Sequence, residues 1–153
     1  MAILWQGLMT SQGATHRSAE VRRLCEARIL LIEDSPPVQI RLKDLLESPG
    51  EYRVSAIVDS APSARAAIET EVFDVLIVDV QLKQGTGIEV IKHARSRYGK
   101  AQRPLIIVLT NYGMPTVEAR CREAGADHFL DKIRQFDLVK PLIMEWRRDH
   151  AGN

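Results

Sequence analysis

The sequence is poor in the residues that mark specialised classes of protein. It has two cysteines, Cys25 and Cys121, which are too few and too far apart for a disulfide framework. Its four histidines show no metal-ligand spacing. No stretch approaches the ~20 apolar residues that span a bilayer, and the apolar opening lacks the length and the charged segment of a signal peptide. These absences favour a cytoplasmic protein.

An excess of charge of one sign is missing as well. The chain carries 21 basic and 20 acidic residues, a formal net charge of +1, which creates no field for nucleic acid or an anionic membrane. We therefore expect neither as a partner. What the chain does have is an ordinary globular composition, 45% apolar and 27% charged, and a length of 153 residues that suits one domain with a real core.

Residues 1–27 differ from the rest because they contain no strand pattern and include a polar, turn-rich run. We assign them to an N-terminal extension that is disordered or forms a short helix. The regular pattern fills residues 28–149, which we assign to one domain. Residues 150–153 are assigned to a tail.

The domain is organised around the stretch Phe73–Asp79 (FDVLIVD). Five of its seven residues are apolar and do not alternate with polar ones, which indicates a strand buried on both faces, as in a parallel sheet. Four further runs are typical of strands, and each of the five is followed by helical periodicity. These runs are residues 29–32, 52–58, 104–109 and 129–130. Such alternation predicts a doubly wound α/β fold with five parallel strands.

The helices have recognisable boundaries. Ser60 and Thr86 are placed to cap two of them, and Gly125 is a suitable left-handed cap after the helix Pro115–Ala124. Cys121 is in helical step with its apolar neighbours, so we expect a buried thiol there. For the last helix the spacing predicts an inward face made of Leu138, Leu142 and Trp146.

Polar and ionisable residues follow the strands where each strand ends. They are Glu33 and Asp34 after the first strand, Asp79 after the third, Thr110 after the fourth and Lys132 after the fifth. Ligands bind at the carboxyl ends of the strands in open parallel sheets. Each residue alone is explained by a solvated turn, a strand end or the first turn of a helix. Five such residues at five such places indicate a functional site.

The residue types at these strand ends point to one kind of chemistry. Three carboxylates brought close together repel one another, and a cation relieves that repulsion. A hard divalent ion such as Mg²⁺ prefers oxygen ligands and keeps several waters. Mg²⁺ beside a carboxylate nucleophile, a lysine and a hydroxyl is the equipment of phosphoryl transfer. The sequence therefore predicts a magnesium-dependent phosphoryl-transfer site.

Four stretches resemble the receiver domain of bacterial two-component response regulators, and the resemblance covers roughly residues 28–149. The stretches are Arg28–Asp34 (RILLIED), Val75–Asp79 (VLIVD), Val108–Thr110 (VLT) and Gly125–Lys132 (GADHFLDK). The resemblance implies a flavodoxin-like sheet with the strand order 2-1-3-4-5. The first and third strands are neighbours in that order, so the three carboxylates would converge.

The resemblance also implies a role for each site residue. Asp79 would be the phosphoacceptor and a ligand of the metal ion. The other metal ligands would be Asp34 directly, Glu33 through a water molecule and Gln81 through its backbone carbonyl. Lys132 and Thr110 would contact the phosphoryl group.

By the same resemblance, Thr110 and Phe129 would form a switch that couples Asp79 to an output surface. In this switch, the phosphoryl group on Asp79 would give the Thr110 hydroxyl a hydrogen-bond partner that it lacks in the unmodified protein. That surface would consist of the fourth helix, the fifth strand and the fifth helix. Exposed apolar residues there would bind a downstream protein or a second copy of the chain. The candidates are Tyr112, Met144 and Trp146, and the alternative for Trp146 is that it packs inward.

Three positions depart from the family pattern. Ile133 follows the lysine where the family usually has a cis proline, so we expect a trans peptide bond and a different loop. Lys83 replaces a common proline, which removes a rigid turn residue from the loop after Asp79. Asn111 replaces Ala or Gly, which narrows entry to the phosphorylation site.

The resemblance predicts a phosphorelay protein that accepts a phosphoryl group from a histidine kinase or a histidine phosphotransfer protein. We expect a stand-alone receiver that signals by docking, a stoichiometric phosphoacceptor with self-catalysed transfer and dephosphorylation rather than an enzyme. One alternative is an adaptor that switches without phosphorylation. A phosphoaspartate-dependent hydrolase is disfavoured, because that class needs an aspartate where Gln81 stands.

Ile40 is a candidate contact for the phosphoryl donor. It lies opposite the apolar face of the first helix of the domain, beside the acid pair Glu33 and Asp34. We therefore expect it to be exposed where a donor histidine must approach. Isolated exposed apolar residues are common and need no explanation, so the role of Ile40 requires a direct test.

Overall fold

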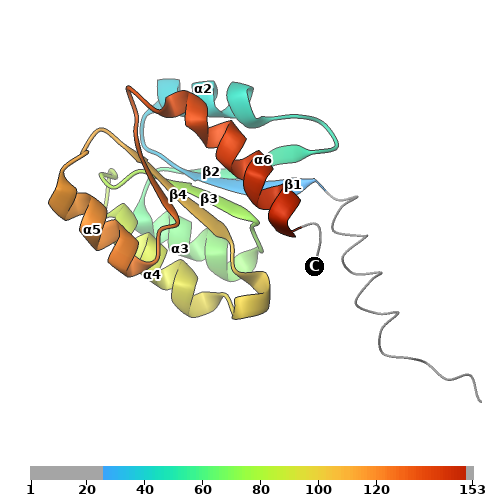
Figure 1. Ribbon diagram of the computed structural model, residues 1–153. Helices are drawn as coiled ribbons and strands as arrows, with labels where there is room; N and C mark the ends of the chain where they lie inside the picture. Colours follow the sequence, from blue (N-terminus) through green and yellow to red (C-terminus); the bar gives the residue numbers. More distant parts are fainter. Residues whose placement is uncertain (1–25, 151–153) are drawn as a thin grey trace, which may run out of the picture.

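The computed structural model describes residues 26–150 and contains one parallel sheet of five strands in the order β2-β1-β3-β4-β5 (Figure 1). The predicted fold class and strand order are confirmed. The strands are β1 Ala27–Ile32, β2 Tyr52–Val58, β3 Val75–Val78, β4 Leu105–Thr110 and β5 His128–Asp131. The predicted helix of the extension, Cys25 and residues 151–153 lie outside the described part of the chain.

Helices cover both faces of the sheet. One layer holds α2 Pro36–Leu46 and α6 Val139–His150, and the other holds α3 Ala61–Thr70, α4 Gly87–Arg97 and α5 Pro115–Ala124 (Figure 1). Two short 3-10 turns, η1 Lys100–Gln102 and η2 Phe136–Leu138, precede β4 and α6. No helix within residues 26–150 is long and apolar enough to cross a membrane.

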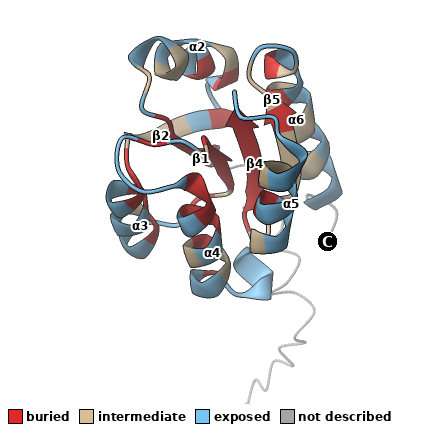
Figure 2. Cartoon of the chain, turned by 90° about the vertical axis from the view of Figure 1, so that its left-hand side faces the viewer, coloured by how far each residue is buried: buried red, intermediate tan, exposed pale blue. Residues whose placement is uncertain are grey.

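The strands alternate their side chains between two apolar cores. In β3, Val75 and Ile77 pack against the layer of α2 and α6, while Leu76 and Val78 pack against α3, α4 and α5. Successive side chains of a strand point to opposite faces, and both faces are covered here. All four residues of β3 are consequently buried, as Figure 2 shows for the middle of the sheet.

The predicted helix boundaries are confirmed where a side chain or a backbone conformation fixes them. The Ser60 hydroxyl accepts a hydrogen bond from the Ser63 amide at 3.3 Å, and the Thr86 hydroxyl accepts one from the Glu89 amide at 3.4 Å. Each bond satisfies an amide that has no partner inside its helix. Gly125 ends α5 with a φ of +117°, a left-handed conformation that glycine adopts without strain. Cys121 is buried, as expected.

The predicted inward face of the last helix is wrong at Leu138, which is 46% exposed. Leu138 belongs to the 3-10 turn η2, in which Phe136 is the buried residue. The turn shifts the phase of the helix that follows, so Val139 and Ile143 supply its fully buried contacts. Leu142 and Trp146 pack only partly against this core.

Candidate functional site

The adjacent strands β1 and β3 bring three carboxylates together. Glu33 and Asp34 directly follow β1, Asp79 directly follows β3, and the two strands end in register at Ile32 and Val78. One oxygen of each carboxylate lies within 4.8 Å of the others. Glu33 and Asp79 are buried whereas Asp34 is exposed. The predicted convergence of the acids is therefore present.

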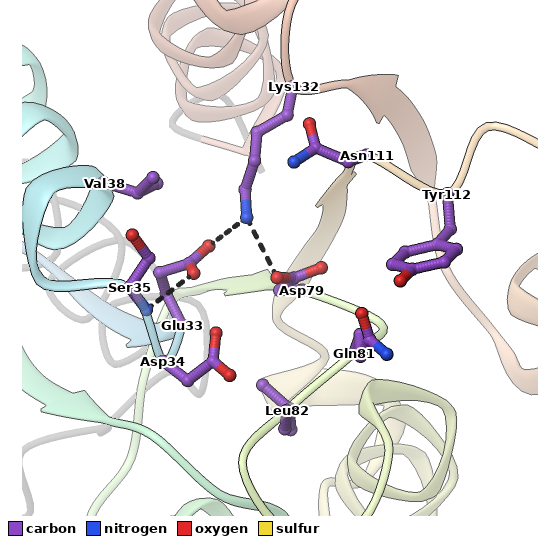
Figure 3. A pocket seen from close by; sticks show the side chains of 10 residues that line it. All are labelled: Glu33, Asp34, Ser35, Val38, Asp79, Gln81, Leu82, Asn111, Tyr112 and Lys132. Carbon is purple, nitrogen blue, oxygen red and sulfur yellow. Dashed lines mark hydrogen bonds and ion pairs between the residues drawn. The ribbon is translucent and has the colours of Figure 1, made fainter.

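Lys132 reaches this cluster from β5, on the far side of β4 (Figure 3). Its ammonium nitrogen lies 2.6 Å from Glu33 Oε2 and 2.9 Å from Asp79 Oδ2. Burial alone lowers the pKa of Lys132, but the hydrogen bonds and charges of Glu33 and Asp79 together outweigh it and raise that pKa. Burial raises the pKa of Glu33, against the hydrogen bonds from Lys132 and the Ser35 amide.

The lysine accounts for only part of the charge balance. By formal charge, three carboxylates count −3 and one ammonium group counts +1, which leaves −2 around the cluster. The ammonium group of Lys132 thus relieves part of the repulsion among the acids. The sequence-based prediction of a metal ion did not include this contribution. The remaining −2 equals the charge that one divalent cation neutralises.

The carboxylates fit Mg²⁺ in number, type and hydrogen bonding. Asp79 Oδ1 is buried and has no hydrogen-bond partner among the described residues, and a buried acceptor left in that state is costly. A metal ion would satisfy it. Both oxygens of Glu33 already accept hydrogen bonds, from the Ser35 amide at 3.0 Å and from Lys132. That arrangement suits a ligand acting through water, while the exposed Asp34 suits a direct one.

The carboxylates open into a cavity of about 400 Å³ (Figure 3). Asp34, Gln81, Asn111, Tyr112 and Lys132 are among its lining residues. Ser35 and Val38 also line it, although their places in the sequence indicate only a helix start and a helix core position. The role of the Gln81 carbonyl as a ligand stays a prediction.

Thr110 lies at the predicted end of β4 but differs from expectation in two respects. It is fully buried and does not line the cavity. Its hydroxyl oxygen also accepts a hydrogen bond from the Tyr112 amide at 3.3 Å. The expectation that this hydroxyl has no partner is therefore wrong, although a hydroxyl that accepts one bond can still donate another.

The other switch and contact residues are placed as follows. Phe129 is half-buried against the core of α3, α4 and α5. Ile40 is exposed on α2, as expected. Tyr112 and Met144 are exposed as well. Trp146 is partly buried instead. The partner contacts predicted for these residues stay predictions.

Where the family would have proline, hydrogen bonds hold the two loops. The peptide bond before Ile133 is trans, as predicted, and Asp131 Oδ1 accepts bonds from the amides of Ile133 and Arg134 at 2.8 and 2.9 Å. These two bonds lower the pKa of Asp131. In the loop after Asp79, the Lys83 amide donates to the Asp59 carbonyl at 3.3 Å.

Replacing Asp34 with asparagine is expected to weaken Mg²⁺ binding at least about tenfold, because a direct anionic ligand is lost. Isothermal titration with MgCl₂ measures the change. Asp44→Asn, which removes an exposed carboxylate of α2 outside the cavity, is the matched control and should bind like the wild type. Equal affinities for Asp34→Asn and the control would remove Asp34 from the ligand set.

Fold and site together define a doubly wound α/β domain with an acidic cleft suited to a divalent cation. Residues 29–142 match the family model of the response regulator receiver domain. The receiver domain of a sensor histidine kinase from Pseudomonas aeruginosa, solved with a magnesium ion coordinated in its active-site cleft, is 25% identical. Its TM-score is 0.66, over 84% of this chain and all of that one (100%). The chain belongs to the response regulator receiver domain family, which serves two-component systems.

Curated relatives are longer than this chain. The sensor histidine kinase GacS of Pseudomonas protegens is 28% identical over 142 residues, which are 91% of this chain and 15% of GacS. A cyclic di-GMP phosphodiesterase of Thermotoga maritima is 30% identical over 128 residues, which are 80% of this chain and 32% of the phosphodiesterase. The match thus spans less than a third of either relative.

Proposed function

We propose that the chain is a single-domain response regulator of a phosphorelay. It accepts a phosphoryl group on Asp79 from a histidine kinase or a histidine phosphotransfer protein and then signals by docking to another protein, in the cytoplasm. The observation that carries the proposal is the contact of Lys132 with both Glu33 and Asp79 inside a cluster of three carboxylates. That cluster combines a nucleophile, a cation and a place for Mg²⁺.

The transfer exchanges one bond to phosphorus for another. An Asp79 oxygen forms a bond to the phosphorus of a phosphohistidine, the P–N bond breaks, and the histidine nitrogen keeps the bonding pair and takes up a proton. Lys132 offsets the negative charge of the phosphoryl oxygens. Asp34, Asp79 and the Gln81 carbonyl would hold Mg²⁺, which supplies further positive charge when bound.

Asp79 is consumed in this reaction and regained only when the phosphoryl group is lost. We therefore propose a stoichiometric phosphoacceptor rather than an enzyme that turns over an external substrate. Labelling with acetyl phosphate and Mg²⁺ tests the proposal. A wild-type protein that takes up no phosphate would instead be a receiver-fold adaptor that switches without phosphorylation.

We also propose that Ile40 contacts the protein that donates the phosphoryl group. It is 63% exposed on α2, the helix that begins directly after the acid pair. Ile133, which is 84% exposed, follows Lys132 and so also lies at the carboxyl ends of the strands. Exposed apolar residues near the segments that supply the acids and Lys132 suit a partner that presents a histidine among apolar side chains.

Ile40→Asp is expected to slow transfer from a cognate histidine kinase about tenfold and to leave labelling by acetyl phosphate unchanged, because a small donor needs no protein contact. Val72→Asp is the control. Val72 is also exposed (49%), but it lies just before β3, at the amino ends of the strands and away from the site. Equal slowing with both donors would indicate a folding defect and contradict the proposed contact.

The output surface that we propose consists of α5, β5 and α6. A phosphoryl group on Asp79 offers an acceptor to the Thr110 hydroxyl, and movement of Thr110 makes room for the half-buried Phe129 to turn further inward. A new hydrogen bond biases such a two-state element by shifting its populations. The exposed Tyr112 and Met144 are then candidate contacts for a target protein or a second copy of the chain.

Amide hydrogen exchange with and without beryllofluoride, a mimic of the aspartyl phosphate, is expected to change mainly within residues 111–146. The reason is that the proposed switch residues act on α5, β5 and α6. The far edge strand β2 serves as the internal reference and should exchange unchanged. Changes confined to residues 80–90 would contradict this output surface.

A further inference from the structure

We propose that the side-chain amide of Asn111 donates a hydrogen bond to the phosphoryl group on Asp79. Asn111 directly follows Thr110 and lines the same cavity as Asp79 and Lys132. Figure 3 shows its amide end pointing toward the space between Lys132 and Asp79. The inference rests on the proposed function, because it assigns a further contact to the same phosphoryl group.

The side-chain donors of Asn111 are not engaged within the described part of the protein, unlike the ammonium group of Lys132. Lys132 is bonded to both Glu33 and Asp79, whereas the Asn111 side chain makes no hydrogen bond to another described residue. A carboxamide NH₂ offers two donors. Asn111 is therefore free to meet an anion that enters the cavity without first breaking a bond within the protein.

The position of the amide also affects loss of the phosphoryl group. In hydrolysis a water oxygen bonds to phosphorus, the P–O bond to Asp79 breaks, and Asp79 regains its carboxylate. Inorganic phosphate leaves, and the protons of the water pass to the phosphate and the solvent. An amide that holds a phosphoryl oxygen at the open side of the cavity also occupies space that the attacking water needs. Asn111 thus both binds the group and prolongs its lifetime.

Two variants separate hydrogen bonding from side-chain size. Asn111→Ala removes the donor and the bulk, whereas Asn111→Leu removes the donor and keeps the approximate bulk. In the presence of Mg²⁺, both variants are expected to bind beryllofluoride about tenfold more weakly than the wild type. This is the effect of losing one hydrogen bond to a charged group. Gln84→Ala removes an exposed amide outside the cavity and should bind like the wild type. Since Asn111 is exposed, both variants are expected to fold and to bind Mg²⁺ normally.

Nuclear magnetic resonance supplies a second measurement that does not depend on activity. The side-chain NH₂ signals of Asn111 in the wild type should shift and exchange more slowly when beryllofluoride binds. Dephosphorylation after labelling should be several times faster in Asn111→Ala than in the wild type, because this variant loses both the donor and the bulk that excludes the attacking water.

Each outcome of these measurements decides the role of Asn111. Wild-type affinity for beryllofluoride in both variants would show that the Asn111 side chain does not contribute to binding. A loss of affinity in only one variant would show that side-chain size matters. Either result would overturn the hydrogen bond. An unchanged Asn111 NH₂ signal in the beryllofluoride complex would overturn it as well. A wild-type protein that neither binds beryllofluoride nor takes up phosphate would overturn the proposed function and this role together.

Discussion

Asp79→Asn is expected to lower magnesium-dependent labelling by acetyl phosphate at least about 100-fold, because an amide oxygen replaces the anionic nucleophile. The protein should stay folded. Asparagine keeps the shape of the buried side chain, its oxygen can still accept the bond from Lys132, and the loss of one carboxylate reduces repulsion from Glu33 and Asp34. Phosphate incorporation per chain, with circular dichroism as a check on folding, measures the result.

Asp59→Asn is the matched control for this substitution. Asp59 follows β2, so it lies at the carboxyl ends of the strands as Asp79 does, but outside the cavity. It forms an ion pair with Lys83 at 3.7 Å. The control should label like the wild type. Undiminished stoichiometry in Asp79→Asn would mean that another residue accepts the phosphoryl group.

Lys132→Met is expected to destabilise the fold by about 3 kcal/mol in the absence of divalent cations. The substitution leaves two buried carboxylates, Glu33 and Asp79, without their cation, and breaking a buried ion pair from one side typically costs about 3–5 kcal/mol. Saturating Mg²⁺ should restore a large part of the loss, since it neutralises the same carboxylates. Urea denaturation with and without MgCl₂ measures both effects.

Lys92→Met is the control for the lysine substitution, because Lys92 is exposed on α4 and makes no described ion pair. Its free energy of unfolding should stay within about 0.5 kcal/mol of the wild type. A similarly small effect of Lys132→Met, or an effect that Mg²⁺ does not reduce, would mean that the lysine is not the cation that balances the acids.

The sequence predicted most of the secondary structure because local patterns carry it. The apolar run ending at Asp79 predicted a strand buried on both faces, and β3 is buried at all four positions. The helix Pro115–Ala124 has the predicted bounds, since proline favours a first turn and Gly125 a left-handed end. The strand order was different in kind, because it came from the family resemblance and not from the residue pattern.

The site was predicted as a set of residues but not as a set of contacts. Because they follow strands, Glu33, Asp79 and Lys132 were predicted to lie together at the carboxyl ends of the sheet. No spacing along the chain indicates that the Lys132 ammonium group lies between Glu33 and Asp79. The fully buried position of Thr110 was not visible either. Both depend on how neighbouring strands are arranged across the sheet.

The sequence also gave no signal for the contacts of Arg95. Its guanidinium donates to the carbonyls of Pro104 and Gly125 and to Asp127, so that α4 is tied to the start of β4, the end of α5 and the start of β5. In the sequence Arg95 is a charged residue near the end of a helix, a position that such residues favour for local reasons. Its tertiary role appears only when the segments meet.

By itself the sequence determined which segments become strands and helices, and which reactive side chains stand at strand ends, because periodicity, capping residues and burial preferences act over a few residues. Only the tertiary structure decided which of those side chains touch. It placed Lys132 between Glu33 and Asp79, directed Asn111 into the cavity, and turned Leu138 outward through a 3-10 turn. These outcomes depend on the packing of segments that are distant in the chain, which local preferences do not encode.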